Sequence, residues 1–178
     1  MGSLDHLWAG WRSDFVTGAT AAADNGRPPG GQPGGCVFCA ILASSLPDEE
    51  LNIVWRHPGG RVLAMLNAYP YTSGHLMVMP TRHVADLEDL APDEPGELWQ
   101  TVTSAVKALK AAYNAEGVNI GANLGRAAGA GVLGHFHVHV LGRWVGDSNF
   151  MTSVANARVL PEPLSDSATK LRAAWPAA

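Results

Sequence analysis

Three histidines alternate with apolar residues in the segment Gly134 to Trp144, whose sequence is GHFHVHVLGRW. Side chains of a β-strand point to opposite faces at successive positions, so His135, His137 and His139 are expected on one face of a strand. Imidazoles in such a row need partners for their ring nitrogens. The pattern therefore indicates metal binding, ligand binding or catalysis, against the alternative of a half-exposed strand whose histidines are merely polar.

The segment just before the histidines is rich in glycine and alanine, and we interpret it as an anion-binding loop. Residues 127–131 read AAGAG, and such small side chains leave backbone N–H groups open to a phosphate. A neutral imidazole is a nucleophile toward phosphorus, so its attack on a nucleotide α-phosphate would give a phosphoramidate that a second acceptor cleaves. The loop amides and a second histidine would stabilise charge on the phosphoryl oxygens.

Cys36 and Cys39 form a CxxC motif and are the only two cysteines of the chain. Two thiolates at this spacing chelate zinc well, and tetrahedral zinc needs two further ligands. Histidine is the expected supplier, with His83 and His135 as candidates. A redox-active dithiol is the competing interpretation, but no strand-helix-strand pattern surrounds the motif. Two free buried thiols are the third alternative.

The segments around these residues predict an antiparallel sheet with one long helix. The turn residues HPGG at 57–60 separate two apolar runs and indicate a hairpin. The long helix is expected from about 92 to 115, with one apolar face. Strands are expected at 51–56, 61–66, 74–80, 117–123, 134–144 and 154–160. Shorter helices are expected at 40–45, 84–90 and 165–175. This succession is typical of the α+β class.

The chain divides by composition into three parts. Residues 1–35 combine a Trp-rich segment, expected to dock on the body of the protein or on a second subunit, with a flexible Gly/Pro linker. Residues 36–160 are expected to form the folded domain that contains the histidines. Residues 161–178 are expected to form a C-terminal extension with a short helix.

The composition is that of an ordinary globular protein, with 47% hydrophobic and 16% charged residues among 178. A formal net charge of −4 gives no basic field for a nucleic-acid polymer, although backbone amides and histidines can still hold a mononucleotide. No apolar run is long enough for a membrane span, and the N-terminus lacks the layout of a signal peptide. We therefore expect a cytoplasmic protein, in which a disulfide between the two thiols is disfavoured.

The run His135-Phe-His137-Val-His139-Val-Leu141 resembles the motif of the histidine triad (HIT) family. The segment GHLMVMPTRH, from Gly74 to His83, is similar to the second signature of that family. The resemblance covers about residues 36–150 and implies a HIT-like fold and a homodimer. The segments LWAGWR, NLGRAAGAG and GRWVGDSNF are similar to those of bacterial diadenosine tetraphosphate phosphorylases and their HIT neighbours.

The resemblance also implies a role for each site residue. His137 is the implied nucleophile, His139 the implied phosphate contact, and Asn67 the implied ribose contact. The phosphate site would be lined by Asn123, Gly129, Ala130, Gly131 and Val132. Zinc-bearing members of the family imply a structural zinc held by Cys36, Cys39, His83 and His135.

Two departures from the family pattern are present, at residues 131–132 and at residue 142. Gly131 and Val132 stand where many HIT hydrolases have a glutamine and a hydroxyl residue, which argues against a hydrolase of the fragile-histidine-triad type. Gly142 stands where relatives often have a proline.

The resulting prediction is a nucleotidyl transferase. His137 attacks the α-phosphate of a dinucleoside polyphosphate, with diadenosine tetraphosphate as the expected substrate, and inorganic phosphate accepts the adenylyl group. The first alternative is a hydrolase that transfers to water from the same substrates or from nucleoside phosphate conjugates. The others are a metal-dependent enzyme with all three histidines on one iron or zinc, and a non-catalytic nucleotide-binding protein.

Overall fold

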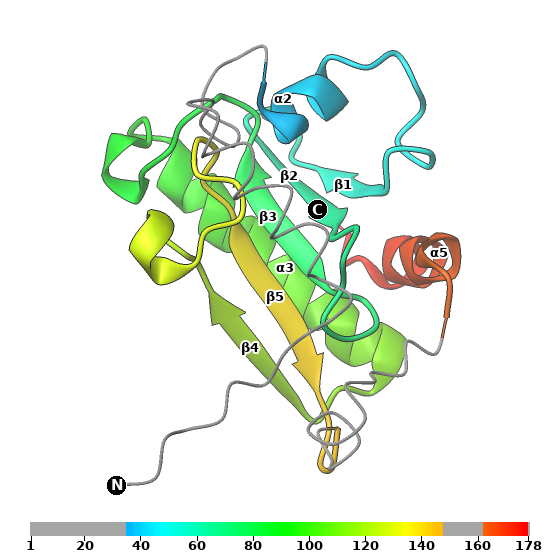
Figure 1. Ribbon diagram of the computed structural model, residues 1–178. Coiled ribbons are helices and arrows are strands. Elements are labelled where there is room, and N and C mark those ends of the chain that lie inside the picture. The colour runs from blue at the N-terminus through cyan, green and yellow to red at the C-terminus, as the bar shows by residue number, and fades with distance from the viewer. Residues whose placement is uncertain (1–34, 148–161, 178) are drawn as a thin grey trace, which may run out of the picture.

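The computed structural model describes residues 35–147 and 162–177, which form a five-stranded antiparallel sheet with helices packed on it (Figure 1). The strands are β1 (Ile53–Arg56), β2 (Val62–Leu66), β3 (Leu76–Pro80), β4 (Gly117–Gly121) and β5 (Val138–Arg143). The helices are α2 (Val37–Leu42), α3 (Glu94–Tyr113) and α5 (Leu164–Ala174), with 3-10 turns η2 (Leu87–Asp89) and η3 (Arg126–Ala128). The strand order is β1-β2-β3-β5-β4. This arrangement confirms the predicted α+β class.

The two faces of the sheet are covered differently. On one face, α3 and α5 bury Leu109 and Leu171 against Val78 and Val138, and α3 runs behind the strands in Figure 1. On the other face, Phe38 of α2 packs in a second cluster with the methionines of β3. Strand β3 is in the middle of the sheet and buried throughout, which explains its continuous apolar run.

Most predicted elements are confirmed, although several of them are shorter in the structure than predicted. β1 and β2 pair in antiparallel fashion across the predicted hairpin, and β4 ends at Gly121. The long helix α3 ends where Asn114 takes a left-handed conformation, with φ of 50°. Helix α5 agrees with the predicted C-terminal helix to within one residue.

Three predicted elements are wrong in extent or type, and the structure shows the reason for each. The first helix begins at Val37, because the residues between the cysteines form its first turn instead of a separate turn. In place of the helix predicted at 84–90, only the 3-10 turn η2 forms. The N–H groups of Asp89 and Leu90 donate to the carbonyls of Asp86 and Leu87, three residues earlier. Strand β5 begins at Val138 rather than 134, and before it Phe136 donates its N–H to the carbonyl of Val84 at 2.7 Å.

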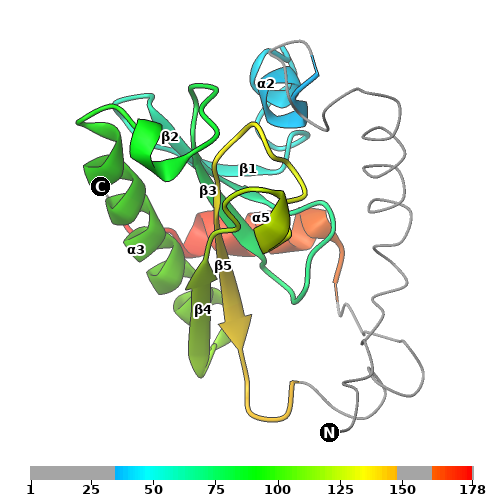
Figure 2. The same cartoon turned by 60° about the vertical axis from the view of Figure 1, so that its left-hand side comes forward.

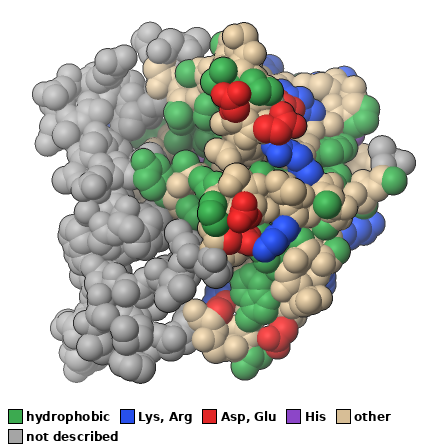
Figure 3. Space-filling model, turned by 90° about the vertical axis from the view of Figure 1, so that its right-hand side faces the viewer, with side chains coloured by type: hydrophobic (Ala, Val, Ile, Leu, Met, Phe, Trp, Pro, Cys, Tyr) green, Lys and Arg blue, Asp and Glu red, His purple; other side chains and the backbone are tan. Residues whose placement is uncertain are grey.

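Several expectations lie outside the described residues, namely the Trp-rich segment, most of the linker and the strand at 154–160. Among the described helices, none combines the length and apolar character needed to cross a membrane. On the face seen in Figure 3, acidic and basic side chains are interspersed, with no broad patch of one sign.

Gly74 precedes β3 with φ of +73°, and we expect alanine there to be strongly destabilising. An added Cβ would lie 2.6 Å from the Tyr113 ring and 2.9 Å from Leu109. The strained backbone and the overlap together predict a loss of about 2–4 kcal/mol in the free energy of unfolding, measured by urea denaturation. Gly96 is the matched control, because an added Cβ there meets nothing within 4 Å. Since Gly96 is inside α3, Gly96→Ala should stabilise by about 0.5–1 kcal/mol. Equal effects of the two substitutions would contradict this account.

Candidate functional site

The three histidines lie on the face of the sheet that carries the methionines. In the sheet His139 stands opposite Met77 of β3 on one side and Gly121 of β4 on the other. The rings of His137 and His139 contact edge to face, with centroids 4.8 Å apart. The alternation of histidine and apolar residues thus holds even though His135 and His137 precede the strand, since Phe136 and Val138 enter the opposite core.

His137 is held in one defined tautomer. Its Nδ1 lies 2.8 Å from the backbone carbonyl of His135, and a carbonyl only accepts, so Nδ1 carries the hydrogen. Burial lowers the pKa of His137 below its ordinary value, partly opposed by this hydrogen bond. The ring is therefore neutral at neutral pH, and its Nε2 carries a lone pair. Phe38 of α2 packs against the same ring, with centroids 5.3 Å apart. This arrangement presents a neutral imidazole nucleophile.

His139 is oriented through His75, the residue before β3. The Tyr71 N–H donates to Nδ1 of His75 at 3.2 Å, so a neutral His75 carries its hydrogen on Nε2. That Nε2 lies 2.9 Å from Nδ1 of His139, which accepts. A neutral His139 then carries its own hydrogen on Nε2. This chain of bonds makes His139 a hydrogen-bond donor, as a phosphate contact requires.

His75 is completely buried and was not among the residues selected from the sequence. The available signal was a histidine at the start of an otherwise apolar strand, GHLMVMP. A buried polar side chain at such a position calls for a partner. That partner is His139, which is distant in the sequence.

Removing His75 is expected to impair the orientation of His139. We expect His75→Ala to lower kcat/KM by about tenfold to a hundredfold, as for outer partners that orient a metal-bound histidine. His75→Gln should retain more activity, because its amide N–H can still donate to His139. Steady-state kinetics measures the effect, and thermal melting of both variants checks folding. Equal activity of the two variants would show that hydrogen bonding by His75 is not needed.

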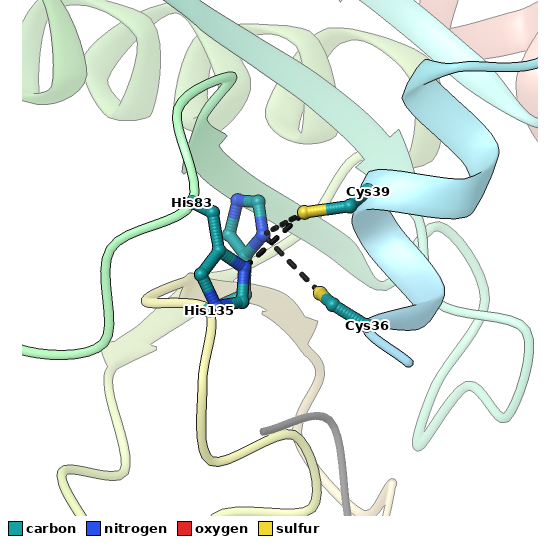
Figure 4. A group of neighbouring side chains, drawn as sticks. All are labelled: Cys36, Cys39, His83 and His135. Carbon is teal, nitrogen blue, oxygen red and sulfur yellow. Dashed lines mark hydrogen bonds between the residues drawn. The ribbon is translucent and has the colours of Figure 1, made fainter. Parts of the chain in front are cut away.

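Four side chains form a compact group of potential metal ligands, Cys36, Cys39, His83 and His135 (Figure 4). Their ligand atoms all lie within 4.8 Å of one another. The sulfur of Cys39 is 3.2 Å from Nδ1 of His83 and 3.6 Å from Nδ1 of His135, and that of Cys36 is 3.5 Å from the latter. The early start of α2 places the cysteines three residues apart on one helical turn. These are the four residues that the family resemblance implied.

The surroundings of this group suit a thiophilic cation. Nε2 of His135 lies 2.8 Å from the carbonyl of Pro80, so Nε2 carries the hydrogen and Nδ1 directs its lone pair toward the sulfurs. Burial, followed by the neighbouring Cys36, raises the pKa of Cys39 to about 11. A cation would favour the thiolate that this environment disfavours. Two sulfur and two nitrogen donors are a common structural zinc set.

The three histidines of the motif therefore have three different partners. Nδ1 of His135 faces the thiols, Nδ1 of His137 the carbonyl of His135, and Nδ1 of His139 the ring of His75. Within the described residues, the group of potential metal ligands includes only the first of them. This division disfavours one metal bound by all three.

The expected nucleotide-binding residues come from two loops next to these histidines. The Asn67 N–H donates to the carbonyl of His75, and its Oδ1 accepts from Tyr69 at 2.9 Å. Asn123 donates its side-chain N–H to the carbonyl of Gly129 at 3.3 Å. Residues 123–129 are exposed, and 130–132 are half-buried. The structure thus brings these residues to the ends of strands β2, β4 and β5, and their contact with a nucleotide stays a prediction.

Comparison with known proteins establishes the family. The HIT domain model matches residues 56–145. The chain is 39% identical to AP-4-A phosphorylase of Mycobacterium tuberculosis over 173 residues, 97% of this chain and 85% of the relative. The chain therefore belongs to the HIT family. The relative that it matches over nearly its whole length is named as a phosphorylase.

Solved structures of the same family share this fold. A zinc-bound histidine triad family protein from Mycobacterium smegmatis superposes with a TM-score of 0.64 at 30% identity, over 80% of this chain and 94% of that chain. A hypothetical histidine triad nucleotide-binding protein from Sulfolobus tokodaii gives a TM-score of 0.63 at 28% identity, over 78% and 91%. These neighbours confirm the HIT-like fold predicted from the two signature segments.

Proposed function

We propose that this chain is a nucleotidyl transferase that phosphorolyses a dinucleoside polyphosphate through a nucleotidyl-histidine on His137. The observation that carries the proposal is the bond from Nδ1 of His137 to the carbonyl of His135 in a buried ring, which leaves Nε2 as the nucleophile. The similarity to the mycobacterial AP-4-A phosphorylase supports diadenosine tetraphosphate as the substrate and phosphate as the acceptor.

In the first half-reaction Nε2 of His137 attacks the α-phosphorus. The new N–P bond forms as the bond from phosphorus to the bridging oxygen breaks, and ATP leaves from the tetraphosphate. The imidazole ring becomes positively charged, so its Nδ1–H bond to the carbonyl of His135 strengthens as the reaction proceeds. The Nε2–H of His139 donates to an oxygen of the transferred phosphoryl group.

In the second half-reaction an oxygen of inorganic phosphate attacks the same phosphorus. The N–P bond breaks, ADP leaves, and His137 returns to the neutral tautomer fixed by His135. Asn67 would hold the ribose, and the phosphate oxygens would lie against Asn123 and residues 129–132, whose small side chains let backbone amides approach.

The group formed by Cys36, Cys39, His83 and His135 would hold one structural zinc ion. The zinc-bound neighbour from M. smegmatis and the donor set of two sulfurs and two nitrogens both support this assignment. All four zinc positions would be filled by side chains, so the ion's contribution would be to fix α2 and the segment at His83 next to the histidine strand.

Strand β4 supports a homodimer. It is at the edge of the described sheet, and its residues 119–121 are exposed, including Ile120 at 45%. An unpaired edge strand of this kind is a template for pairing with a second copy. Analytical ultracentrifugation would test this, with Ile120→Lys expected to weaken the dimer. The proposed division of the chain is an N-terminal segment at 1–35, the HIT-like domain at 36–160 and a C-terminal extension at 161–178. Two cysteines that are not joined in a disulfide fit a cytoplasmic location.

The acceptor is tested by running the reaction with and without inorganic phosphate. We expect diadenosine tetraphosphate to give ATP and ADP, at a rate that depends on the phosphate concentration. Release of ATP and AMP at an equal rate without phosphate would identify a hydrolase instead. The two acceptors differ only in the second half-reaction, so this product analysis separates them.

A further inference from the structure

The loop between β4 and β5, residues 122–137, is attached to the histidine site at both ends. Gly121, the last residue of β4, stands opposite His139 in the sheet. At its other end the loop itself contains His135 and His137, directly before β5. Val132 packs against the methionine-side cluster that contains Phe38. The loop therefore folds over the face that carries the histidines.

Within this loop the turn η3 is held in a defined shape. Gly125 and Gly129 flank the turn with φ of 76° and 82°, a backbone conformation that favours glycine. The N–H of Ala130 donates to the carbonyl of Gly125 at 3.3 Å, and Asn123 bonds to Gly129. The turn lies near the end of β4, where β5 begins (Figures 1 and 2). Arg126 is the first residue of this turn and is exposed.

Arg126 is distinguished by its charge and by the lack of an ion-pair partner within residues 35–147 and 162–177. It is the only Lys, Arg, Asp or Glu between Glu116 and Arg143. In the described part of the chain, no carboxylate lies within ion-pair distance of its guanidinium. The other five arginines there are held: Arg56 by Asp48, Arg61 by Glu97, Arg82 by Glu94, Arg143 by Asp147, and Arg172 by backbone carbonyls. Among the described arginines, Arg126 is therefore the one that is exposed on the loop beside the histidines and has no ion-pair partner in the described residues.

We propose that Arg126 binds the phosphates of the leaving group, beyond the phosphorus that His137 attacks, and so selects substrates with long phosphate chains. This inference rests on the proposed function and names the residue that sets its substrate preference. A polyphosphate carries several negative charges, and the chain itself has a net charge of −4. Binding of the polyphosphate therefore requires a local cation such as Arg126. A guanidinium can hold two phosphate oxygens at once and stabilise the charge that develops as the leaving group departs.

The test compares two substrates that deliver the same adenylyl group. Diadenosine tetraphosphate has a polyphosphate leaving group, and the p-nitrophenyl ester of AMP has a leaving group without phosphate. We expect Arg126→Gln to lower the ratio of kcat/KM for the tetraphosphate over the ester by about tenfold to a hundredfold, the effect of a lost charge-assisted bond. Lys107→Gln is the matched control, because Lys107 is an exposed cation on α3, and it should leave the ratio unchanged.

Each other outcome overturns the role of Arg126. An unchanged ratio in Arg126→Gln, whether both substrates lose activity equally or neither does, shows that Arg126 does not contact the leaving group. An equal fall of the ratio in Lys107→Gln would show that the loss of any positive charge has this effect, and not the loss of a contact made by Arg126. The adduct on His137 distinguishes the two proposals: its absence in the unmodified protein overturns the proposed function, and with it this inference. Its presence together with an unchanged ratio overturns the role of Arg126 alone.

Discussion

His137→Ala is expected to lower the rate of diadenosine tetraphosphate turnover by about 10⁴-fold or more and to abolish the covalent adduct. The reason is that the substitution removes the proposed nucleophile. Nδ1 of His137 donates its hydrogen to the backbone carbonyl of His135, so Nε2 carries the lone pair that attacks phosphorus. Nucleotide affinity should fall much less, since the loops that hold the ribose and phosphates remain. Single-turnover kinetics and calorimetric titration measure the two effects separately.

His57→Ala is the matched control for this prediction. His57 belongs to the turn between β1 and β2, where it contacts Glu97 and Trp55 rather than the other histidines. We expect its removal to leave turnover within about twofold. Substantial turnover by His137→Ala would refute covalent catalysis at this residue and would favour a non-covalent enzyme.

Loss of one of the four potential metal ligands, Cys36, Cys39, His83 and His135, has the second large expected effect. Cys36→Ser removes a buried sulfur from the cluster in which Nδ1 of His135 lies 3.5 Å away. We expect zinc content to fall from one ion per chain toward zero and the free energy of unfolding to drop by about 3–5 kcal/mol. That drop corresponds to a melting temperature lower by roughly 10 °C for a chain of this size. Elemental analysis and thermal melting measure these changes.

The same substitution should also reduce the rate of adduct formation. Nδ1 of His135 lies 3.5 Å from the sulfur of Cys36, and the backbone carbonyl of His135 accepts the bond from Nδ1 of His137. A displaced His135 would therefore disturb the tautomer of the nucleophile. Val37→Ala is the control, because Val37 is exposed in the same turn of α2 and supplies no ligand atom. A full complement of zinc in Cys36→Ser, or an equal loss of stability in Val37→Ala, would contradict the assignment.

The sequence alone predicts much of the site because its periodicities are local. Alternation at 135–140 was enough to predict the histidine face, and the apolar run at 76–80 was enough to predict a central strand. The CxxC motif and the family resemblance predict four metal ligands, and the structure brings these four side chains together. Tautomers and orientations could not be read in this way, because they depend on long-range bonds such as that from His75 to His139.

The mistaken start of β5 has the same origin. No local pattern shows that Phe136 bonds to Val84 and thereby delays the start of β5. The role of Gly142 is likewise visible only in the folded structure. In the structure Trp144 donates to the carbonyl of Tyr113 at 3.2 Å and folds over Gly142, where an added Cβ would lie 2.9 Å from the indole. The absence of a side chain at 142 thus accommodates the tryptophan.

The covalent intermediate on His137 is tested most directly by weighing it. The protein is mixed with diadenosine tetraphosphate without inorganic phosphate, quenched with denaturant at alkaline pH, where phosphoramidates persist, digested and analysed by mass spectrometry. We expect a mass increase of one adenylyl group on the peptide that contains His137, and we expect this increase to disappear when phosphate is added before the quench. Turnover with no adduct at any time, or an adduct on a different residue, would contradict covalent catalysis at His137.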